Sequence, residues 1–172
     1  DYGVYADQDY LAEAWACWWV YPRKWIPQLR EKAPDLRSAR RILDLGNGVG
    51  WTTAMLRQLW PDADVAGTNV AGSDQWKLCE AIARIYRFRM VEELEPADLV
   101  VASEYFEHFL RPLDELKRVL EQSRPRWLVV ANAFTQPDAV GHFSTYEIGA
   151  EEVPGHAVGR RFSAYLKENG YT

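Results

Sequence analysis

A short segment in the first third of the chain limits the possible fold more than any other. Residues 41–53 read RILDLGNGVGWTT, in which an apolar run containing Asp44 leads into glycines at positions 46, 48 and 50. This pattern is typical of a buried strand that stops at a tight turn, with a helix starting just beyond it. Glycine allows positive φ and leaves space where a Cβ would lie, so a ligand can approach bare main chain and the N–H groups of the helix start. The segment predicts a ligand-binding loop in an α/β fold.

The spacing of these glycines separates two kinds of ligand loop. A dinucleotide fingerprint needs G-x-G-x-x-G, and Trp51 stands where its third glycine would fall. The segment instead resembles the D-x-G-x-G-x-G motif of class I S-adenosylmethionine (SAM)-dependent methyltransferases. The resemblance implies that SAM is the cofactor, that the loop holds its methionine part and ribose, and that the acid anchors the loop or the ligand's ammonium. The cofactor-binding residues expected here are Asp44, Gly46, Asn47, Gly48 and Gly50.

Strands and helices are expected to alternate along the rest of the chain. The expected strands cover residues 42–45, 64–68, 86–91, 98–102 and 127–131, and the expected helices cover 52–60, 73–84, 112–122 and 159–168. Such β-α-β units predict an α/β fold with a doubly wound, mostly parallel sheet and helices on both faces. The run 98–102 is apolar enough to be buried on both faces of that sheet.

The chain is expected to form one compact unit with two parts. Residues 1–40 are predicted to be a helical cap rich in aromatic residues, including a helix over 7–20, and residues 41–172 to be the Rossmann-like SAM-binding domain. The resemblance implies a further strand and an antiparallel partner after the last helix. The sequence stops two residues beyond Gly170, the expected C-cap, so we expect the C-terminal hairpin to be truncated.

The end of the expected second strand departs from the family pattern. In the resembling family an acid commonly stands here and accepts two hydrogen bonds from the ribose diol, whereas this chain has Asn69 followed by Val70. A neutral amide oxygen is a weaker acceptor than a carboxylate. We place both residues in the cofactor site, and we expect Asn69→Asp to leave SAM affinity unchanged or to improve it.

The fourth strand leads into a second stretch that carries the resemblance. Residues 96–109, PADLVVASEYFEHF, resemble the "fDlV…s-e-v-l-E-H" segment of many small-molecule methyltransferases of this class. The resemblance implies that Ser103 and Glu104 lie beside the sulfonium of SAM and that Glu107 and His108 line the substrate mouth. His108 is the first candidate for a catalytic base. The alternative for His108 is that it only makes a local hydrogen bond. The alternative for Glu107 is that it is a carboxylate at a helix start, where the helix dipole favours a negative charge.

The loop after the fifth strand adds a second candidate base, His142. In the resembling fold this loop often helps to shape the acceptor site, and an ordinary surface loop is the equal alternative. The sequence has no Cys/His spacing typical of a metal site and no phosphate-binding G-x-x-x-x-G-K-[ST] loop, so no metal is expected.

Together these residues predict a SAM-dependent methyltransferase acting on an oxygen or nitrogen of a small-molecule acceptor. Methyl transfer from a sulfonium mainly needs alignment of donor and acceptor, with a base only where the acceptor carries a proton. Two alternatives stay open. One is a SAM-fold binding or partner subunit without its own transferase activity, which Asn69 favours; the other is an aminopropyl transferase, which the few acids at the strand ends disfavour.

Composition narrows the possible partners. A net charge of −5 argues against broad electrostatic attraction to nucleic acid or to an anionic membrane. No apolar run approaches the ~20 residues of a membrane-spanning helix. The two cysteines, Cys17 and Cys79, lie in expected helices and fit reduced thiols of a cytoplasmic protein better than a disulfide. Composition leaves the oligomeric state open.

Overall fold

The computed structural model describes residues 12, 20–139 and 141–171. Within these residues one parallel sheet has the strand order β3-β2-β1-β4-β5. Its strands are β1 (Arg41–Leu45), β2 (Asp64–Thr68), β3 (Arg89–Val91), β4 (Leu99–Ser103) and β5 (Trp127–Ala131). The longer helices are α2 (Ile26–Lys32), α3 (Trp51–Leu59), α4 (Asp74–Tyr86), α5 (Pro112–Ser123) and α6 (Gly155–Glu168). The remaining elements are the short helices η3 (Tyr21–Trp25), η4 (Pro34–Ser38) and η5 (Phe106–His108) and the strands β6 (Thr145–Ile148) and β7 (Glu151–Pro154).

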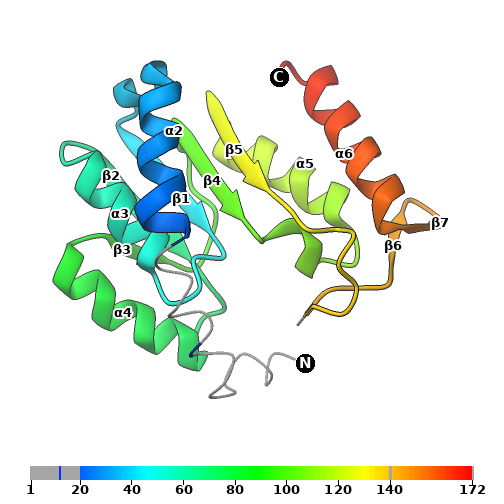
Figure 1. Ribbon diagram of the computed structural model, residues 1–172, viewed down its shortest axis with the longest axis horizontal. Helices are drawn as coiled ribbons and strands as arrows, with labels where there is room; N and C mark the ends of the chain where they lie inside the picture. Colours follow the sequence, from blue (N-terminus) through cyan, green and yellow to red (C-terminus); the bar gives the residue numbers. More distant parts are fainter. Residues whose placement is uncertain (1–11, 13–19, 140, 172) are drawn as a thin grey trace.

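Helices cover both faces of the sheet, which confirms the predicted fold class. Because side chains alternate along a strand, Ile42 packs in one core with residues of α2, α3 and α4, while Leu43 and Leu45 pack in another with α5 and α6. Figure 1 shows α3 and α4 on the β2–β3 side of the molecule and α6 with the β6–β7 hairpin on the β5 side. Strand order changes direction between β1 and β4, and ligands bind at such a point in open α/β sheets.

Several expected boundaries were displaced by local turn chemistry. The third strand is shorter than expected because α4 continues to Tyr86 and ends at Arg87, whose φ of 61° is left-handed. The side chain of Ser73 caps the start of α4 as expected, accepting a hydrogen bond from the backbone N–H of Trp76 at 3.0 Å. The fifth strand has the expected bounds but is only half-buried, because it is the last strand in the sheet order.

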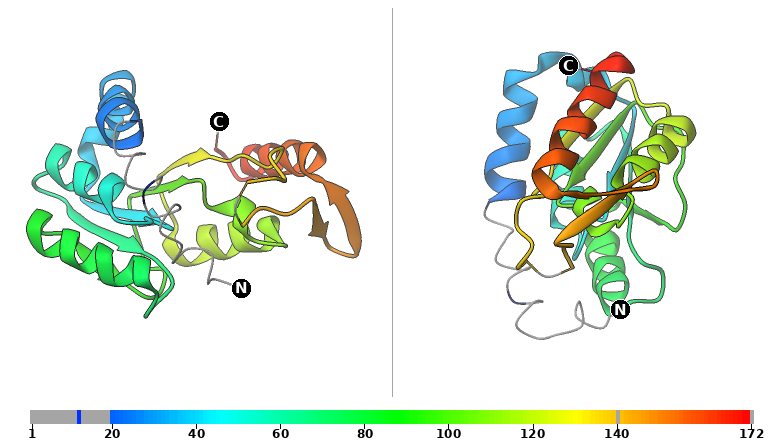
Figure 2. Two further views of the ribbon diagram at one scale, coloured as in Figure 1. Left: turned by 60° about the horizontal axis from the view of Figure 1, so that its bottom comes forward. Right: turned by 90° about the vertical axis from the view of Figure 1, so that its right-hand side faces the viewer.

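The largest departure lies between β5 and α6. The sequence interpretation placed a loop with His142 after the fifth strand and expected no strand before the last helix, but Thr145–Ile148 and Glu151–Pro154 pair as an antiparallel hairpin that projects at one end of the molecule (Figure 2, left). Polar and apolar residues alternate across residues 145–148 before a Gly-Ala turn, which is a hairpin signal that the sequence interpretation missed. The last helix also starts four residues earlier than expected, at Gly155 directly after Pro154.

Some predictions fall outside what the structure describes. The helix expected over residues 7–20 lies almost wholly there, as does Cys17, whereas Cys79 is a buried free thiol. Among the described helices none is long and apolar enough to cross a membrane.

Candidate active site

The glycine loop after β1 is fastened to the end of the neighbouring strand β2. The backbone N–H of Gly46 donates to the Thr68 hydroxyl at 3.2 Å, and the N–H of Asn47 donates to the Thr68 carbonyl at 2.9 Å. Gly46, Gly48 and Gly50 all have positive φ, at 59°, 53° and 93°. The three glycines therefore adopt the positive φ values for which the sequence analysis considered glycine suited.

Asp44 lies under this loop. It is 2% exposed, and its carboxylate accepts a 2.6 Å hydrogen bond from the Thr53 hydroxyl at the start of α3. Asn47 is also buried, and its amide donates to the Thr53 hydroxyl at 3.0 Å and to the Cys79 sulfur at 3.2 Å. Burial raises the pKa of Asp44 to about 7, with the Thr53 hydrogen bond opposing the shift, and burial raises the pKa of the Cys79 thiol to about 12. Asp44 and Asn47 thus brace the loop from below.

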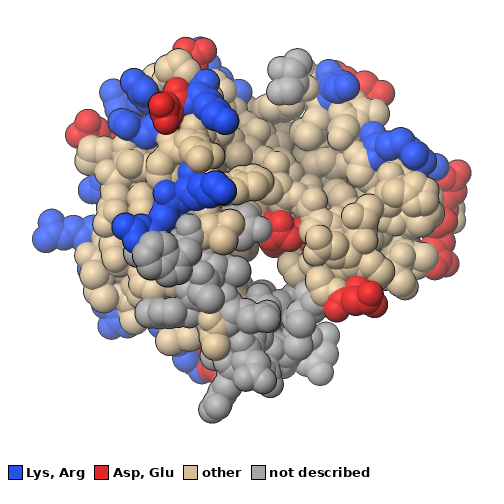
Figure 3. All heavy atoms as spheres, in the orientation of Figure 1, with Lys and Arg blue, Asp and Glu red and all other residues tan. Residues whose placement is uncertain are grey.

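A pocket of about 290 Å³ opens at the carboxyl ends of the first four strands of the sheet. Figure 3 shows the surface hollowed beyond the end of β4, with an acidic side chain at the rim. The predicted site residues that line the pocket are Gly46, Gly48, Asn69, Val70, Glu104 and His108. Other predicted site residues, namely Asp44, Asn47, Gly50, Ser103, Glu107 and His142, are not among its lining residues.

Gly48 and Asn69 form one side of the pocket. A Cβ added at Gly48 would meet nothing within 4 Å, so a larger side chain would extend into open pocket space. The Asn69 amide donates to the Gly48 carbonyl at 2.7 Å, and its own oxygen accepts from the backbone N–H of Val70 at 2.8 Å. Asn69 therefore links the end of β2 to the glycine loop through a hydrogen bond, a role that the sequence interpretation did not foresee.

Several pocket residues were missed by the sequence interpretation. Glu92 and Leu94 follow β3, the one strand end that was not inspected, and the rule that ligands bind at carboxyl ends would have indicated them. Tyr105 also lines the pocket, and its ring lies where a Cβ on Gly46 would come within 2.6 Å. Its hydroxyl donates to Glu115 at 2.6 Å, and Arg118 donates twice to the same carboxylate. Arg118 comes from α5, and we find no local signal in the sequence that places it at the pocket.

The end of β4 turns sharply into η5. Glu104 has a φ of 51°, an uncommon conformation for a residue with a side chain, and its backbone N–H donates to the Ala131 carbonyl at 2.7 Å. Glu107 is fully buried, and one of its carboxylate oxygens accepts from the backbone N–H of Ala133 at 2.7 Å. Burial raises the pKa of Glu107 above its usual range. Strained backbone and a buried acid are features that gather at functional sites.

The two candidate bases meet beside these acids. The rings of His108 and His142 lie edge to face with centroids 4.9 Å apart, and His108 Nδ1 is 3.2 Å from the Gly141 carbonyl. Burial lowers the pKa of His108 below its usual range. Both predicted histidines and both predicted acids thus lie close together beside the pocket that Glu104 and His108 line, although they come from segments more than 30 residues apart.

A family model described as a methyltransferase domain matches residues 18–163. The chain belongs to this family. The match spans the glycine loop, the β4 end and the start of α6, and it confirms the predicted family. No curated protein sequence matches the chain.

Solved structures share the fold of this methyltransferase domain. A coclaurine N-methyltransferase bound to N-methylheliamine and S-adenosylhomocysteine (SAH) aligns with a TM-score of 0.56 and 17% identity, over 82% of this chain and 47% of that one. The plantazolicin methyltransferase BpumL, in complex with a monoazolic desmethylPZN analog and SAH, gives a TM-score of 0.54 and 14% identity, over 71% and 52%. A candidate O-methyltransferase from Nostoc punctiforme aligns with a TM-score of 0.52 and 19% identity, over 71% of this chain and 37% of that one.

These likenesses establish the Rossmann-like fold of the methyltransferase domain. The chain spans between 37% and 52% of the length of the three solved structures. The acceptor and the role of each site residue are therefore inferred below from the geometry of this chain.

Proposed function

We propose that the protein is a SAM-dependent methyltransferase that transfers a methyl group to an oxygen or nitrogen of a small-molecule acceptor. The observation that carries the proposal is the pocket itself, in which an open glycine loop, Glu104 and His108 lie at the carboxyl ends of adjacent parallel strands. The family match and the SAH-bound neighbours support SAM as the cofactor.

The cofactor side of the pocket is proposed to be the β1–β2 half. Gly48 presents main chain with nothing within 4 Å of the place where a Cβ would lie, Gly46 lines the pocket beside the Tyr105 ring, and Asn69 and Val70 border the same space. Ser103, whose hydroxyl is buried without a hydrogen-bond partner among the described residues, stands at the end of β4 just before Glu104. When bound, SAM supplies a methyl group that is activated by its positive sulfur. The chain then has to fix that group against the acceptor and exclude water.

The acceptor side is proposed to be the β4–β5 half. If Nδ1 of His108 donates to the Gly141 carbonyl, Nε2 is the nitrogen with the lone pair, and it can take a proton from an acceptor hydroxyl or ammonium. Glu107 is held by the Ala133 N–H and borders the same end. His142, edge to face with His108, is the second candidate base.

A transfer assay tests the proposal. The protein is incubated with SAM and a panel of phenols, alcohols and amines, and methylated product and SAH are quantified by mass spectrometry. We expect equal amounts of both with at least one acceptor class. His108→Ala should lower turnover roughly a hundredfold with SAM affinity unchanged, since a positioned base contributes ~10²–10⁴-fold. His156→Ala, which changes an exposed histidine on α6, is the matched control.

The alternative outcomes are distinct. Binding of SAM without turnover across the whole panel would favour a binding or partner subunit. Failure to bind SAM would overturn the proposal. A His108→Ala protein with full turnover would leave the transferase function standing and remove His108 from its proposed role.

A further inference from the structure

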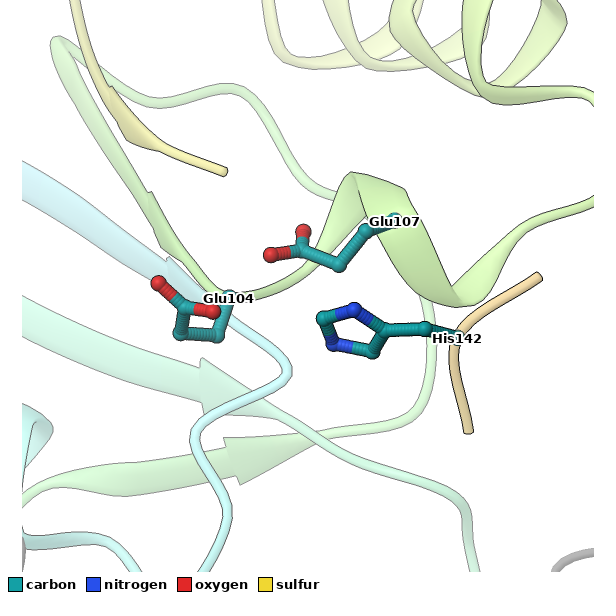
Figure 4. Close-up of side chains that lie close together, drawn as sticks. All are labelled: Glu104, Glu107 and His142. Carbon is teal, nitrogen blue, oxygen red and sulfur yellow. The ribbon is translucent and has the colours of Figure 1, made fainter. Parts of the chain in front are cut away.

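Three ligand-type side chains converge at the acceptor side of the pocket. Glu104 comes from the turn after β4, Glu107 from η5 and His142 from the segment before β6, and Figure 4 shows their polar ends turned toward one another. One carboxylate oxygen from each acid and one ring nitrogen of the histidine all lie within 4.8 Å of one another. The sequence interpretation considered these residues only one at a time, as SAM-binding or catalytic groups.

Two of the three side chains have buried polar atoms that nothing in the described part of the chain satisfies. Glu107 is fully buried, and while Oε1 accepts from the Ala133 N–H, Oε2 has no donor. Glu104 faces Glu107 closely enough for a hydrogen bond, but only if one of the two carboxyls is protonated. His142 Nδ1 is likewise buried without a partner. Buried polar atoms are almost always paired, so unpaired atoms aimed at one point indicate a missing ligand.

We propose that Glu104, Glu107 and His142 bind a divalent metal ion. Two carboxylate oxygens and one imidazole nitrogen form a mixed donor set that suits Zn²⁺ or Mn²⁺ better than Mg²⁺, which prefers oxygen alone. Atoms that ligate one such ion at ~2.0–2.2 Å lie roughly 3–4.4 Å apart. The present separations therefore need only a small closure of the side chains.

The charge and the burial of these side chains also favour a divalent cation as the ligand. A divalent cation offsets two carboxylates, one of which is fully buried, and supplies the partner that the unpaired oxygen and nitrogen lack. The contact of Glu107 with the Ala133 N–H fixes one oxygen and leaves the other for the ion.

The position of the metal site beside the pocket indicates a role in binding the acceptor, and this step rests on the proposed function. Glu104 lines the pocket, so an ion held by it would border the space proposed for the acceptor. Three protein ligands leave coordination positions open, and an acceptor with a hydroxyl could fill one. The metal site thus deepens the proposed function toward oxygen acceptors.

The test measures metal binding in the absence of SAM and acceptor. Protein stripped with a chelator is titrated with Mn²⁺ by electron paramagnetic resonance and with Zn²⁺ by calorimetry. We expect one site, and we expect Glu104→Gln and His142→Gln to lower its affinity at least tenfold. Glu121→Gln and His156→Gln, which change an exposed acid on α5 and an exposed histidine on α6, should leave affinity unchanged.

The outcomes decide the proposal without reference to activity. Saturable binding that both cluster variants lose, with wild-type circular dichroism and melting temperature before metal is added, supports it. If one variant fails to fold, loss of binding in the other folded variant is sufficient. An absence of binding, or binding that the cluster variants retain, overturns the site and indicates two carboxyls that share a proton, while leaving the transferase proposal untouched.

Discussion

At the scale of the residue, the protonation of Asp44 under the glycine loop should make the stability of the protein depend on pH. Its carboxyl is 2% exposed, accepts a hydrogen bond from Thr53 near the Cys79 thiol, and has a pKa raised from 3.8 to about 7 by burial. Between these values the folded protein keeps a proton that the unfolded chain loses, so the free energy of unfolding should fall as pH rises through this window. At ~1.4 kcal/mol per pKa unit the contribution of Asp44 is about 4 kcal/mol.

Asp44→Asn should remove this part of the pH dependence. An amide oxygen can still accept from Thr53 without carrying a charge, so the variant should lose less stability than the wild type between pH 4 and pH 7. Urea unfolding across this range measures the difference. Asp62→Asn, at an exposed site, is the control and should follow the wild type. Parallel curves for Asp44→Asn and the wild type would show that Asp44 is ionised throughout.

Asn69 shows how one hydrogen bond changes an expectation. The sequence interpretation expected Asn69→Asp to preserve or improve SAM affinity, but the Asn69 amide donates to the Gly48 carbonyl at 2.7 Å. A carboxylate has no proton to donate and would face that carbonyl oxygen. We now expect Asn69→Asp to weaken SAM binding tenfold or more, about 1.4 kcal/mol, through a displaced glycine loop.

Calorimetric titration with SAM measures this effect. Gly48→Val, whose side chain would occupy the pocket, provides the reference for complete loss, and Asp74→Asn provides an exposed control nearby. Unchanged affinity for Asn69→Asp would mean that the tie between Asn69 and Gly48 does not set the shape of the loop.

At the scale of the element, the start of α6 is fixed by a close approach. A Cβ on Gly155 would lie 1.7 Å from the carbonyl oxygen of Phe134, whereas one on Gly159, a turn further along, would only touch the Phe134 ring at 3.9 Å. The first glycine is therefore required by packing between α6 and the β5 end. The second is a helix-interior glycine with room for a methyl group.

Alanine substitutions should separate the two glycines. Gly155→Ala should destabilise the protein by at least ~1–3 kcal/mol because backbone must move. Gly159→Ala should stabilise it by roughly 0.5–1 kcal/mol, since alanine loses less conformational freedom than glycine in a helix. Urea unfolding of both variants, each serving as control for the other, tests the packing of α6. Equal effects would contradict this docking of the helix.

At the scale of the whole molecule, parallel pairing is what assembles the site. β1 pairs with β2 on one side and β4 on the other, so the glycine loop stands between the Asn69 turn and the Glu104 turn. β5 lies next to β4, and the chain beyond it returns past η5 to carry His142 against His108. Residues from Gly46 to Arg118 thereby line one pocket, and no single element holds the proposed chemistry.

The sequence by itself determined the elements and the family. Alternate glycines after an apolar run, apolar strands and helical periodicity are local features, because they depend on backbone sterics and on burial over a few residues. They were sufficient to predict the sheet and the loop, while the resemblance of residues 41–53 and 96–109 to methyltransferase motifs implied the family and six of the residues that line the pocket. The hairpin after β5 was also visible locally, in its alternation and its Gly-Ala turn, but it was overlooked.

Only the tertiary structure decided the partners of the side chains. Nothing local to Asn69 shows that its amide donates to Gly48, and nothing local to Tyr105 shows that Glu115 and Arg118 hold its hydroxyl against the pocket. The same holds for the two buried atoms of Glu107 and His142 that have no partner among the described residues. Hydrogen bonding and desolvation depend on distances between groups that are far apart in sequence, and folding alone sets those distances.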